Sequence, residues 1–367
     1  ARRRMSEYAH VEKPLLTQLA ALGWTVIDQG AGVIPTDPSR SLRNGFRDLY
    51  LPDVFRAAVR GLNRTIDGRE WLTTRQLQIL ADDIFRQPNR CLLEANEEVQ
   101  RLLLKAHADR NELTGEESPT VRLIDFEHPE RNTFHAINQF RVDTPGCVKA
   151  FIIPDVVLFV NGLPLVVIEA KIGDANTANP MHEAFVQLQR YRNGRSATRD
   201  AGLNEGEPRL FYPNLFVIRT CGEAAEFGTI SSATEHFYAW RNIWPESYAK
   251  FHPPRGEARQ QEQLVQGLLN KHALLDMLRT STVFMDLPNG KRVKLSARYQ
   301  QHRAARRIVD RLRTGQTPTE RSGVIWHTQG SGKSLTMVFV GRMIRTSPDL
   351  QDFKLLLVVD RVDLMSI

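Results

Sequence analysis

The sequence predicts an α/β protein made of two units: a mixed sheet flanked by helices, then the beginning of a parallel α/β unit. Three observations lead to this. The 367 residues leave room for two domains, each with its own core. Strand-like runs fill residues 121–170 and include Asn161-Gly162, a strong hairpin signal. The third observation is a strand, helix, strand pattern near the end of the chain. Residues 324–326 read as a strand, a glycine-rich turn leads into a helix to about Arg345, and residues 353–359 read as a second strand, which implies a parallel pair with a right-handed crossover.

The elements of the first unit follow from periodicity. Leucines at helical spacing before Gly23 predict a helix that stops there, and Trp24 to Ile27 reads as a strand. Residues 31–110 read as mostly helical, and the amphipathic stretch from Met181 to Arg192 predicts another helix. Strands are expected at 121–126, 134–142, 150–160, 165–170 and 215–220.

The boundary between the units is expected near residue 255. Its marker is His252-Pro253-Pro254-Arg255-Gly256, which precedes a long helical segment from Gln261 to Leu278, although turns of this kind also occur inside helical domains. The predicted domains are therefore 1–255 and 256–367.

Composition limits the class of protein. Lys and Arg outnumber Asp and Glu by 49 to 42, a mild excess that fits a polyanionic partner or solvated helix faces equally well. Basic groups at 291–294 and 298–313 could neutralise phosphates. The 3 cysteines are far apart, so no disulfide framework or zinc site is indicated, and a reducing cytoplasm is expected. No signal peptide or membrane span is predicted.

Two acids and a lysine are placed at the ends of the predicted hairpin strands. Asp155 lies in the first strand after a proline, and Glu169-Ala170-Lys171 ends the second. Glu169 and Lys171 are two residues apart and share one face, and the turn can carry Asp155 alongside them. Carboxylates suit Mg²⁺, so Asp155 and Glu169 are the predicted metal ligands, and Lys171 can position water or neutralise phosphate charge. The alternative is a surface salt bridge at a sheet edge.

This order of residues resembles the PD-(D/E)xK nuclease superfamily. Gln187 and Tyr191, four apart on one helix face, resemble the Gln-x-x-x-Tyr element of its RecB-like branch. Related nucleases carry a glutamate on the first helix, and Glu12 matches best. Because Pro14 is comfortable only in a first turn, Glu12 is expected at the start of the helix, with Glu7 as the alternative.

A phosphate-binding loop is predicted at residues 327–334. The stretch His327-Thr328-Gln329-Gly330-Ser331-Gly332-Lys333-Ser334 has the context of a Walker A loop, in which glycines allow close approach of the phosphates, Lys333 reaches the β and γ phosphates and Ser334 can hold Mg²⁺. His327 replaces the first glycine, which favours a motor ATPase over kinases or small GTPases. Gln301 resembles the adenine-contacting glutamine of superfamily 2 helicases. ATP is therefore the expected nucleotide.

In combination and order, these motifs, together with residues 359–364, resemble the restriction subunit of type I restriction-modification enzymes. The resemblance implies a PD-(D/E)xK nuclease domain followed by a RecA-like motor. It also implies ATP-driven pumping and cutting of double-stranded DNA, with methyltransferase and DNA-specificity subunits as partners. Two alternatives stay open, namely a RecB-like repair nuclease fused to a helicase and a DNA-binding assembly module. No Asp-Glu-x-His motif follows Ser334, so ATP turnover by these residues alone is not expected.

Overall fold

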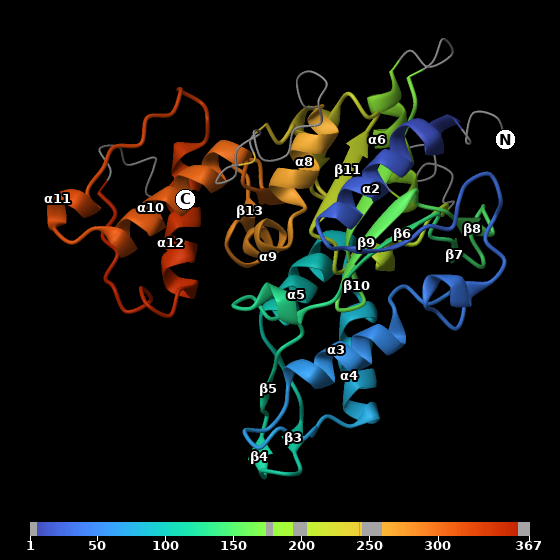
Figure 1. The fold of residues 1–367 in the computed structure, drawn as a ribbon, viewed down its shortest axis with the longest axis horizontal. Coiled ribbons are helices and arrows are strands. Elements are labelled where there is room, and N and C mark those ends of the chain that lie inside the picture. The colour runs from blue at the N-terminus through green and yellow to red at the C-terminus, as the bar shows by residue number, and fades with distance from the viewer. Residues whose placement is uncertain (1–5, 174–178, 194–203, 242, 244–258, 359–367) are drawn as a thin grey trace.

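The computed structural model describes residues 6–173, 179–193, 204–241, 243 and 259–358, and a mixed six-stranded sheet lies at its centre (Figure 1). The strand order is β1-β6-β9-β10-β11-β12. The pairs β1–β6 and β10–β11 are parallel and the other three are antiparallel. The bounds are β1 (Thr25–Ile27), β6 (Phe134–Asn138), β9 (Val156–Val160), β10 (Leu163–Ala170), β11 (Phe216–Thr220) and β12 (Ala225–Gly228).

Helices flank this sheet, which confirms the predicted mixed α/β architecture. Helix α2 (Lys13–Ala21) packs on β1 and on α8 (Gln260–Leu268), and α6 (Pro180–Tyr191) packs on β10 and β11. The helices α3 (Pro52–Leu62), α4 (Thr74–Phe85) and α5 (Leu92–Leu104) lie above the β3–β4 hairpin in Figure 1, and α3 packs against the turn between β9 and β10. Short turns and hairpins complete this part: η1 (Tyr8–Glu12), η2 (Pro38–Ser41), η3 (Pro129–Arg131), η4 (Pro208–Phe211), η5 (Thr234–His236), β2 (Ala106–His107), β3 (Arg110–Asn111), β4 (Glu116–Glu117), β5 (Thr120–Val121), β7 (Val142–Asp143) and β8 (Phe151–Ile152).

The predicted hairpin is present between β9 and β10. Asn161 and Gly162 have φ values of 50° and 79°, the left-handed pair that a tight two-residue turn between strands requires. A side chain at Gly162 would also collide with helix α3, since an added Cβ would lie 2.7 Å from the Leu51 carbonyl oxygen. Both strands are buried throughout, so the hairpin forms the middle of the core.

Three expected strands are shorter than predicted. In the run at 121–126, only Val121 belongs to a strand, the short β5. The backbone N–H groups of Arg122 and Asp125 donate to the side chains of Asn63 and Asn132, so they are not free to pair with another strand. The run at 134–142 is interrupted where Gln139 takes a φ of 48°. The run at 150–160 is interrupted at Pro154, which has no N–H to donate.

The predicted helix from Gln261 to Leu278 is two helices, α8 and α9 (Lys271–Thr280). Asn270 ends the first and caps the second, because its side chain accepts from the Ala273 N–H at 2.9 Å. The Trp24 indole donates to the Leu269 carbonyl at 3.0 Å, so this region packs on the first unit. The predicted marker of the boundary, residues 252–256, lies outside the described residues.

The C-terminal part contains a hairpin and a pair of packed helices. The hairpin is formed by β13 (Thr282–Asp286) and β14 (Arg292–Ser296), and the helices are α10 (Tyr299–Thr314) and α12 (Lys333–Thr346), with a short α11 (Pro318–Arg321) between them. The predicted strands at 324–326 and 353–359 are not strands as far as residue 358. A strand needs a neighbour for its ladder of hydrogen bonds, and these segments have none among the described residues. Trp326 and Leu356 are accordingly exposed.

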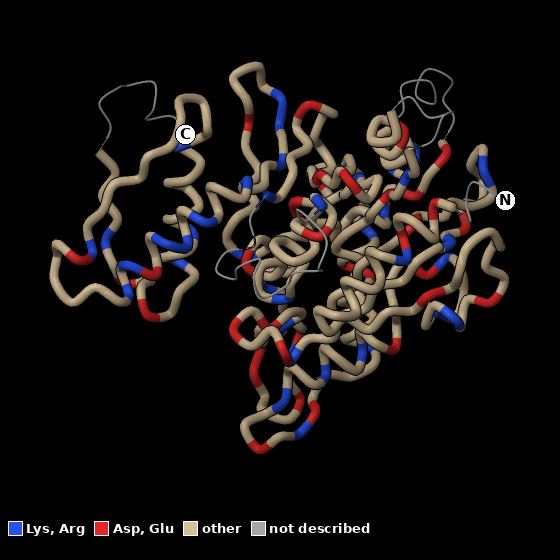
Figure 2. Tube along the Cα trace, turned by 45° about the horizontal axis from the view of Figure 1, so that its top comes forward, with Lys and Arg blue, Asp and Glu red and all other residues tan. Residues whose placement is uncertain are grey.

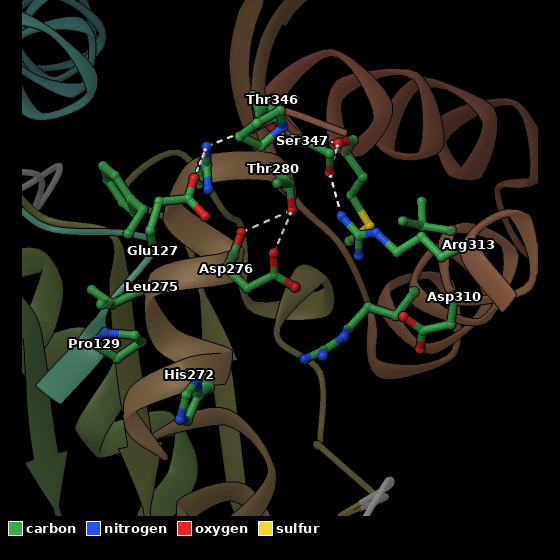
Figure 3. Close-up of a pocket in the computed structure, with 16 residues that line it drawn as sticks. Glu127, Pro129, His272, Leu275, Asp276, Thr280, Asp310, Arg313, Thr346 and Ser347 are labelled. Carbon is green, nitrogen blue, oxygen red and sulfur yellow. Dashed lines mark hydrogen bonds and ion pairs between the residues drawn. The ribbon is translucent and has the colours of Figure 1, made fainter. Parts of the chain in front are cut away.

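A polar seam joins these C-terminal helices to the first unit (Figure 3). Arg279 on α9 forms an ion pair with Glu127 at 2.6 Å and donates to the Thr346 carbonyl at the end of α12. Asp276 is also on α9, and its Oδ2 lies 2.8 Å from Nε2 of His302 on α10, within hydrogen-bond distance. Helix α9 therefore contacts both parts of the chain.

Acidic and basic positions are interspersed along much of the described chain. In Figure 2, Lys and Arg recur along the C-terminal helices. The basic group at 291–294 contributes little to an open phosphate-binding surface, because Lys294 is buried and Arg292 forms ion pairs with Glu97 and Asp286. No described helix is long and apolar enough to cross a membrane.

Candidate active site

Asp155 and Glu169 are brought together by the β9–β10 hairpin, as predicted. Asp155 immediately precedes β9, in the break after Pro154 and not inside the strand, while Glu169 is the next-to-last residue of β10. One Asp155 oxygen, Oδ2, accepts from the Ala170 N–H at 2.8 Å. This bond fixes the aspartate across the antiparallel pair.

Lys171 completes this cluster. Its Nζ lies 2.6 Å from Glu169 Oε1 and 3.4 Å from Asp155 Oδ2, and it donates to the Ala170 carbonyl at 2.8 Å. Burial alone would lower the pKa of Lys171, but the charges of Glu169, Asp155 and Glu7 hold that pKa above its ordinary value. The site therefore contains a fixed cation between carboxylates, and it is largely buried, unlike an exposed surface salt bridge.

Glu169 has one oxygen without a partner. The residue is 2 % exposed, and its Oε2 has no hydrogen-bond partner among the described residues. Burial and the charge of Asp155 raise the pKa of Glu169 well above its usual range, against the effects of Lys171 and of the neighbouring Tyr191 hydroxyl, whose hydrogen bond of good geometry goes to the Ile153 carbonyl. A buried carboxylate oxygen in this state is a site where a cation would be stabilising.

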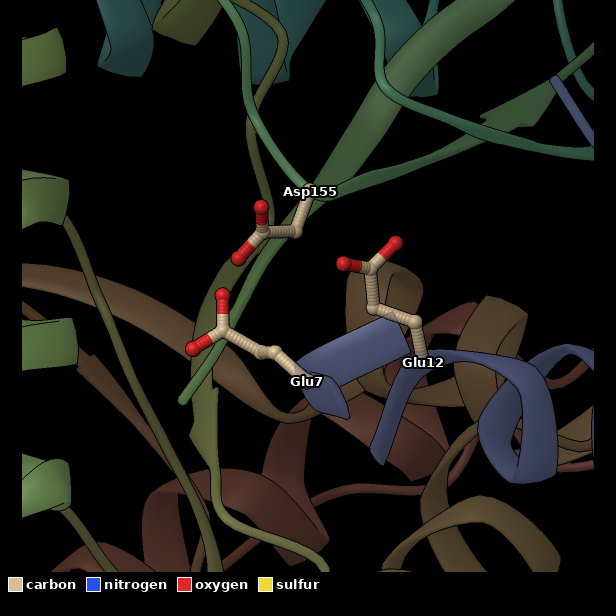
Figure 4. Close-up of side chains that lie close together, drawn as sticks. All are labelled: Glu7, Glu12 and Asp155. Atoms are coloured by element: carbon tan, nitrogen blue, oxygen red, sulfur yellow. The ribbon is translucent and has the colours of Figure 1, made fainter. Parts of the chain in front are cut away.

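Two glutamates from the first helix reach the same place (Figure 4). Glu7, Glu12 and Asp155 each offer a carboxylate oxygen, and these oxygens lie within 4.8 Å of one another. Glu7 also accepts from the Ile172 N–H at 3.2 Å and lies 3.6 Å from Lys171 Nζ. Both glutamates considered in the sequence are thus beside Asp155.

A π-helical turn makes this arrangement possible. Residues Tyr8–Glu12 form a five-residue π turn, in which the Lys13 N–H donates to the Tyr8 carbonyl, and helix α2 continues from it. In an α-helix, side chains five residues apart point about 140° away from each other, whereas the wider turn returns them to one face. Glu12 is the residue before the start of α2, with Pro14 in the first turn, as expected, but the π turn that precedes α2 and extends helical backbone back to Glu7 was not predicted.

The carboxylates repel one another. Burial, followed by the charge of Asp155, raises the pKa of Glu12 to about 8, while hydrogen bonds from Gln139 and Asn138 oppose the rise. Mg²⁺ prefers oxygen ligands of this kind. The close carboxylates of Glu7, Glu12 and Asp155 therefore fit a divalent cation, while Glu169, the other predicted ligand, is not part of this group of three and contacts Lys171.

The two predicted site residues on helix α6 differ in burial, because Tyr191 is in the core and Gln187 is half-buried. Tyr191 is 4 % exposed, and its hydroxyl donates to the Ile153 carbonyl at 2.8 Å, two residues before Asp155. Burial, together with the charges of Glu169 and Asp155, raises its pKa well above the ordinary value. Gln187 is half-buried and accepts from Arg190 at 3.2 Å.

Gln139 was not singled out from the sequence. It is buried, and its side-chain nitrogen lies 3.2 and 3.3 Å from the two Glu12 oxygens. A signal was present in the polar pair Asn138-Gln139, which interrupts an otherwise apolar strand pattern. The sequence pattern does not indicate which residues the side-chain amides of Asn138 and Gln139 would contact.

The predicted phosphate loop lies far from this cluster along the long axis of the molecule (Figure 1). Gly330 and Gly332 have φ values of 74° and 80°, and helix α12 begins at Lys333. Lys333 Nζ donates to the carbonyls of His327 at 3.0 Å and Thr328 at 3.2 Å, so the lysine folds over its own loop. Ser334 follows on the first turn of α12, where it could reach a cation.

Gln301 contacts this loop. Its Oε1 accepts from the Arg298 N–H at 2.9 Å at the start of α10, and its Nε2 lies 3.0 Å from the Gly332 carbonyl. Both ends of the amide are thus engaged within the protein. Contact with adenine remains a prediction for this residue, as do the roles of Thr328, Gln329, Ser331 and Ser334.

Comparison with known proteins gives two family matches. Residues 4–236 match the family described as the type I restriction enzyme R protein N terminus, and residues 300–366 match the SWI2/SNF2 ATPase family.

Similar curated proteins are endonuclease subunits by name. The chain is 28% identical over 361 residues to the type I restriction enzyme HindI endonuclease subunit of Haemophilus influenzae, covering 96% of this chain and 31% of that protein. It is 24% identical over 378 residues to the putative MjaIXP endonuclease subunit of Methanocaldococcus jannaschii, covering 98% of this chain and 33% of that protein. The chain spans about a third of the length of these relatives. It belongs to the type I restriction enzyme R protein family, as its N-terminal region followed by the start of a SWI2/SNF2 ATPase segment.

Proposed function

We propose that this chain carries the nuclease site and the nucleotide-binding loop of a type I restriction enzyme. The reaction is Mg²⁺-dependent hydrolysis of phosphodiester bonds in double-stranded DNA, coupled in the complete protein to ATP-dependent translocation. The observation that carries this proposal is the buried cluster of Asp155, Glu169 and Lys171 at the ends of β9 and β10. The names of the curated relatives support the same reading.

The site residues would divide the work as follows. Asp155 and Glu169 would hold Mg²⁺, with Glu12 and Glu7 as further oxygen donors beside Asp155. The bound ion would polarise the phosphodiester and make water a better nucleophile. Lys171 is close enough to both acids to orient the attacking water or to neutralise charge that develops on the phosphate. Gln187 and Tyr191 would support this cluster from α6, and Tyr191 does so by its hydrogen bond near Asp155.

The nucleotide site would be built by the loop at 327–334. Lys333 would exchange its contacts with the loop carbonyls for the β and γ phosphates, and Ser334 would hold the nucleotide's Mg²⁺. Gly330 and Gly332 would let backbone N–H groups approach the phosphates. Gln301 would contact adenine after releasing the loop.

The test uses the full-length subunit with its partners on supercoiled plasmid that bears a target site. Asp155→Ala, Glu169→Ala and Lys171→Ala should each abolish DNA cleavage and leave ATP hydrolysis unchanged. Lys333→Ala should abolish ATP hydrolysis and also cleavage, because cutting depends on translocation. Asp53→Ala, at an aspartate that is 81% exposed on α3, is the matched control and should behave as wild type. Normal cutting by the Lys333 variant would contradict the coupling, and loss of ATPase in the Asp155 variant would make that residue structural.

Partners follow from the same proposal. We expect the full-length protein to copurify with a methyltransferase and a DNA-specificity subunit, and to act in the cytoplasm. Recovery with repair proteins in their place would favour a RecB-like nuclease-helicase.

A further inference from the structure

Gln139 links two acids that reach the candidate metal site from different parts of the chain. Its backbone N–H donates to the Asp155 carbonyl at 2.8 Å. Its side-chain nitrogen lies 3.3 Å from Glu12 Oε1 and 3.2 Å from Glu12 Oε2. Gln139 therefore contacts the backbone of Asp155, 16 residues away in the sequence, and the side chain of Glu12, 127 residues away.

The backbone of Gln139 is in an unusual conformation. Its φ of 48° is in the left-handed region, which residues with a Cβ adopt at an energetic cost and glycine adopts freely. At this point the strand β6 ends, but the chain still runs beside the segment that leads into β9, because the N–H groups of Gln139 and Phe140 donate to the carbonyls of Asp155 and Pro154. A glycine would adopt this φ without strain, whereas the glutamine adds a side chain that reaches Glu12.

Hydrogen bonds from neighbouring residues hold the backbone at Gln139. The Asn138 side chain accepts from the Gln29 N–H at 2.6 Å and donates to the Gly30 carbonyl at 3.0 Å. The Gln29 side chain donates in return to the carbonyls of Asn138 at 2.8 Å and Gln139 at 3.3 Å. These bonds join the backbone at Asn138 and Gln139 to the segment that follows β1, and this support holds the Gln139 amide beside Glu12.

The chemistry of the amide suits this position. A lysine or arginine beside Glu12 would neutralise the carboxylate and compete with a cation for it. A neutral amide donates hydrogen bonds and leaves the charge of the carboxylate in place.

We propose that Gln139 is a positioning residue, which orients the Glu12 carboxylate so that it and Asp155 can share one divalent cation. The proposal rests on the proposed function, since it assumes a cation beside Asp155. Hydrogen bonds to metal-binding carboxylates typically change metal affinity by 10–100-fold, and an effect of about 10-fold is expected here.

The experiment measures Mn²⁺ binding to the full-length protein by electron paramagnetic resonance, with Mn²⁺ as the spectroscopic substitute for Mg²⁺. Gln139→Gly removes the side chain and relieves the backbone. Its thermal midpoint should stay equal or rise, and its Mn²⁺ dissociation constant should rise by about 10-fold. Asn89→Gly is the matched control, because Asn89 is exposed, has a φ of 61° and lies outside the site. It should leave Mn²⁺ binding unchanged.

A second readout separates positioning from loss of fold. In the complete enzyme, Gln139→Gly should raise the Mg²⁺ concentration for half-maximal cleavage by about 10-fold, while the rate at saturating Mg²⁺ falls much less. If the glycine variant does not fold, Gln139→Met, which keeps length without a donor, is measured by the same criteria.

The outcomes are distinguishable. Wild-type affinity for Mn²⁺ in the folded Gln139 variants, with binding abolished in Asp155→Ala, overturns the positioning proposal and leaves the metal site standing. Absence of Mn²⁺ binding by the wild type, or unchanged binding by Asp155→Ala, overturns the proposed metal site and the inference with it.

Discussion

The side-chain nitrogen of Lys294 donates to the side-chain oxygen of Asn96 at 2.9 Å, across 198 residues of sequence. It also donates to the Asn214 carbonyl at 2.6 Å, and the lysine is 1% exposed. Asn96 in turn donates to the same carbonyl at 2.9 Å. A buried polar network therefore joins the β13–β14 hairpin to α5 and to the segment before β11, so the hairpin is anchored in the first unit.

This network makes stability depend on pH. Burial lowers the pKa of Lys294 from 10.5 to about 7, so between these values the folded state binds fewer protons than the unfolded state. The free energy of unfolding should rise with pH across this range, by at most about 1.4 kcal/mol per pH unit from this group. In Lys294→Met that rise should be missing. Urea denaturation at pH 6.5, 8 and 9 measures it, and parallel profiles for the two proteins would contradict the prediction.

Glu12 gives a pH dependence of opposite sign. Its pKa is raised from 4.5 to about 8, so the folded state binds more protons and wild-type stability should fall as pH rises between these values. Glu12→Gln should therefore become more stable than wild type as pH rises from 5 to 8, by roughly 1–3 kcal/mol, while its divalent-cation affinity falls. Chemical denaturation in EDTA, with Glu223→Gln at an exposed glutamate as control, tests this. If the Glu12→Gln variant is more stable than wild type by the same amount at every pH, its gain in stability does not come from the titration of Glu12.

Tyr191 and Gln187 should differ in their effects on stability. Tyr191→Phe leaves the Ile153 carbonyl without its hydrogen bond, which costs about 1–3 kcal/mol and loosens the segment that leads to Asp155. Both the thermal midpoint and cleavage should fall. Gln187→Ala should lower cleavage with little loss of stability, because the side chain is half-buried. Equal losses of stability in both variants would remove the distinction.

The two glycines of the phosphate loop provide a matched pair. At Gly332 an added Cβ would lie 2.5 Å from Gln301 Nε2, whereas at Gly330 it would meet no atom within 4 Å. Both residues have positive φ, so both alanine variants carry backbone strain, but only Gly332→Ala adds a collision. We expect Gly332→Ala to weaken nucleotide binding more, because it displaces Gln301, the residue proposed to contact adenine; a fluorescent ATP analogue and the full-length protein measure this. Equal effects at both glycines would contradict a role for the contact with Gln301.

The part of the candidate site on the β9–β10 hairpin could be predicted from the sequence, because it depends only on residues close together in the chain. Asn161-Gly162 specifies a tight turn, and that turn brings Asp155 beside Glu169 and Lys171. The period of a strand places the last two on one face. These relationships need no knowledge of distant parts of the chain.

Features that depend on distant partners could not be read in this way. The π turn at Tyr8–Glu12 faces Asp155, and the left-handed Gln139 faces Glu12, so both are understood only when the fold is assembled. The apolar run at 324–326 has strand character, but its ladder requires a neighbouring strand. The domain boundary near residue 255 stays a prediction, since α8 beyond it packs on α2.

The π turn at Tyr8–Glu12 has a consequence for recognising the site in other sequences. Side chains four residues apart on a regular α-helix share a face, as Glu7 and Glu12 do here at a separation of five. Removing one residue between the two glutamates would restore regular helix and still direct both toward the aspartate. A one-residue deletion at this point is therefore geometrically neutral, and a search that fixes the separation would miss chains with the same pair of ligands.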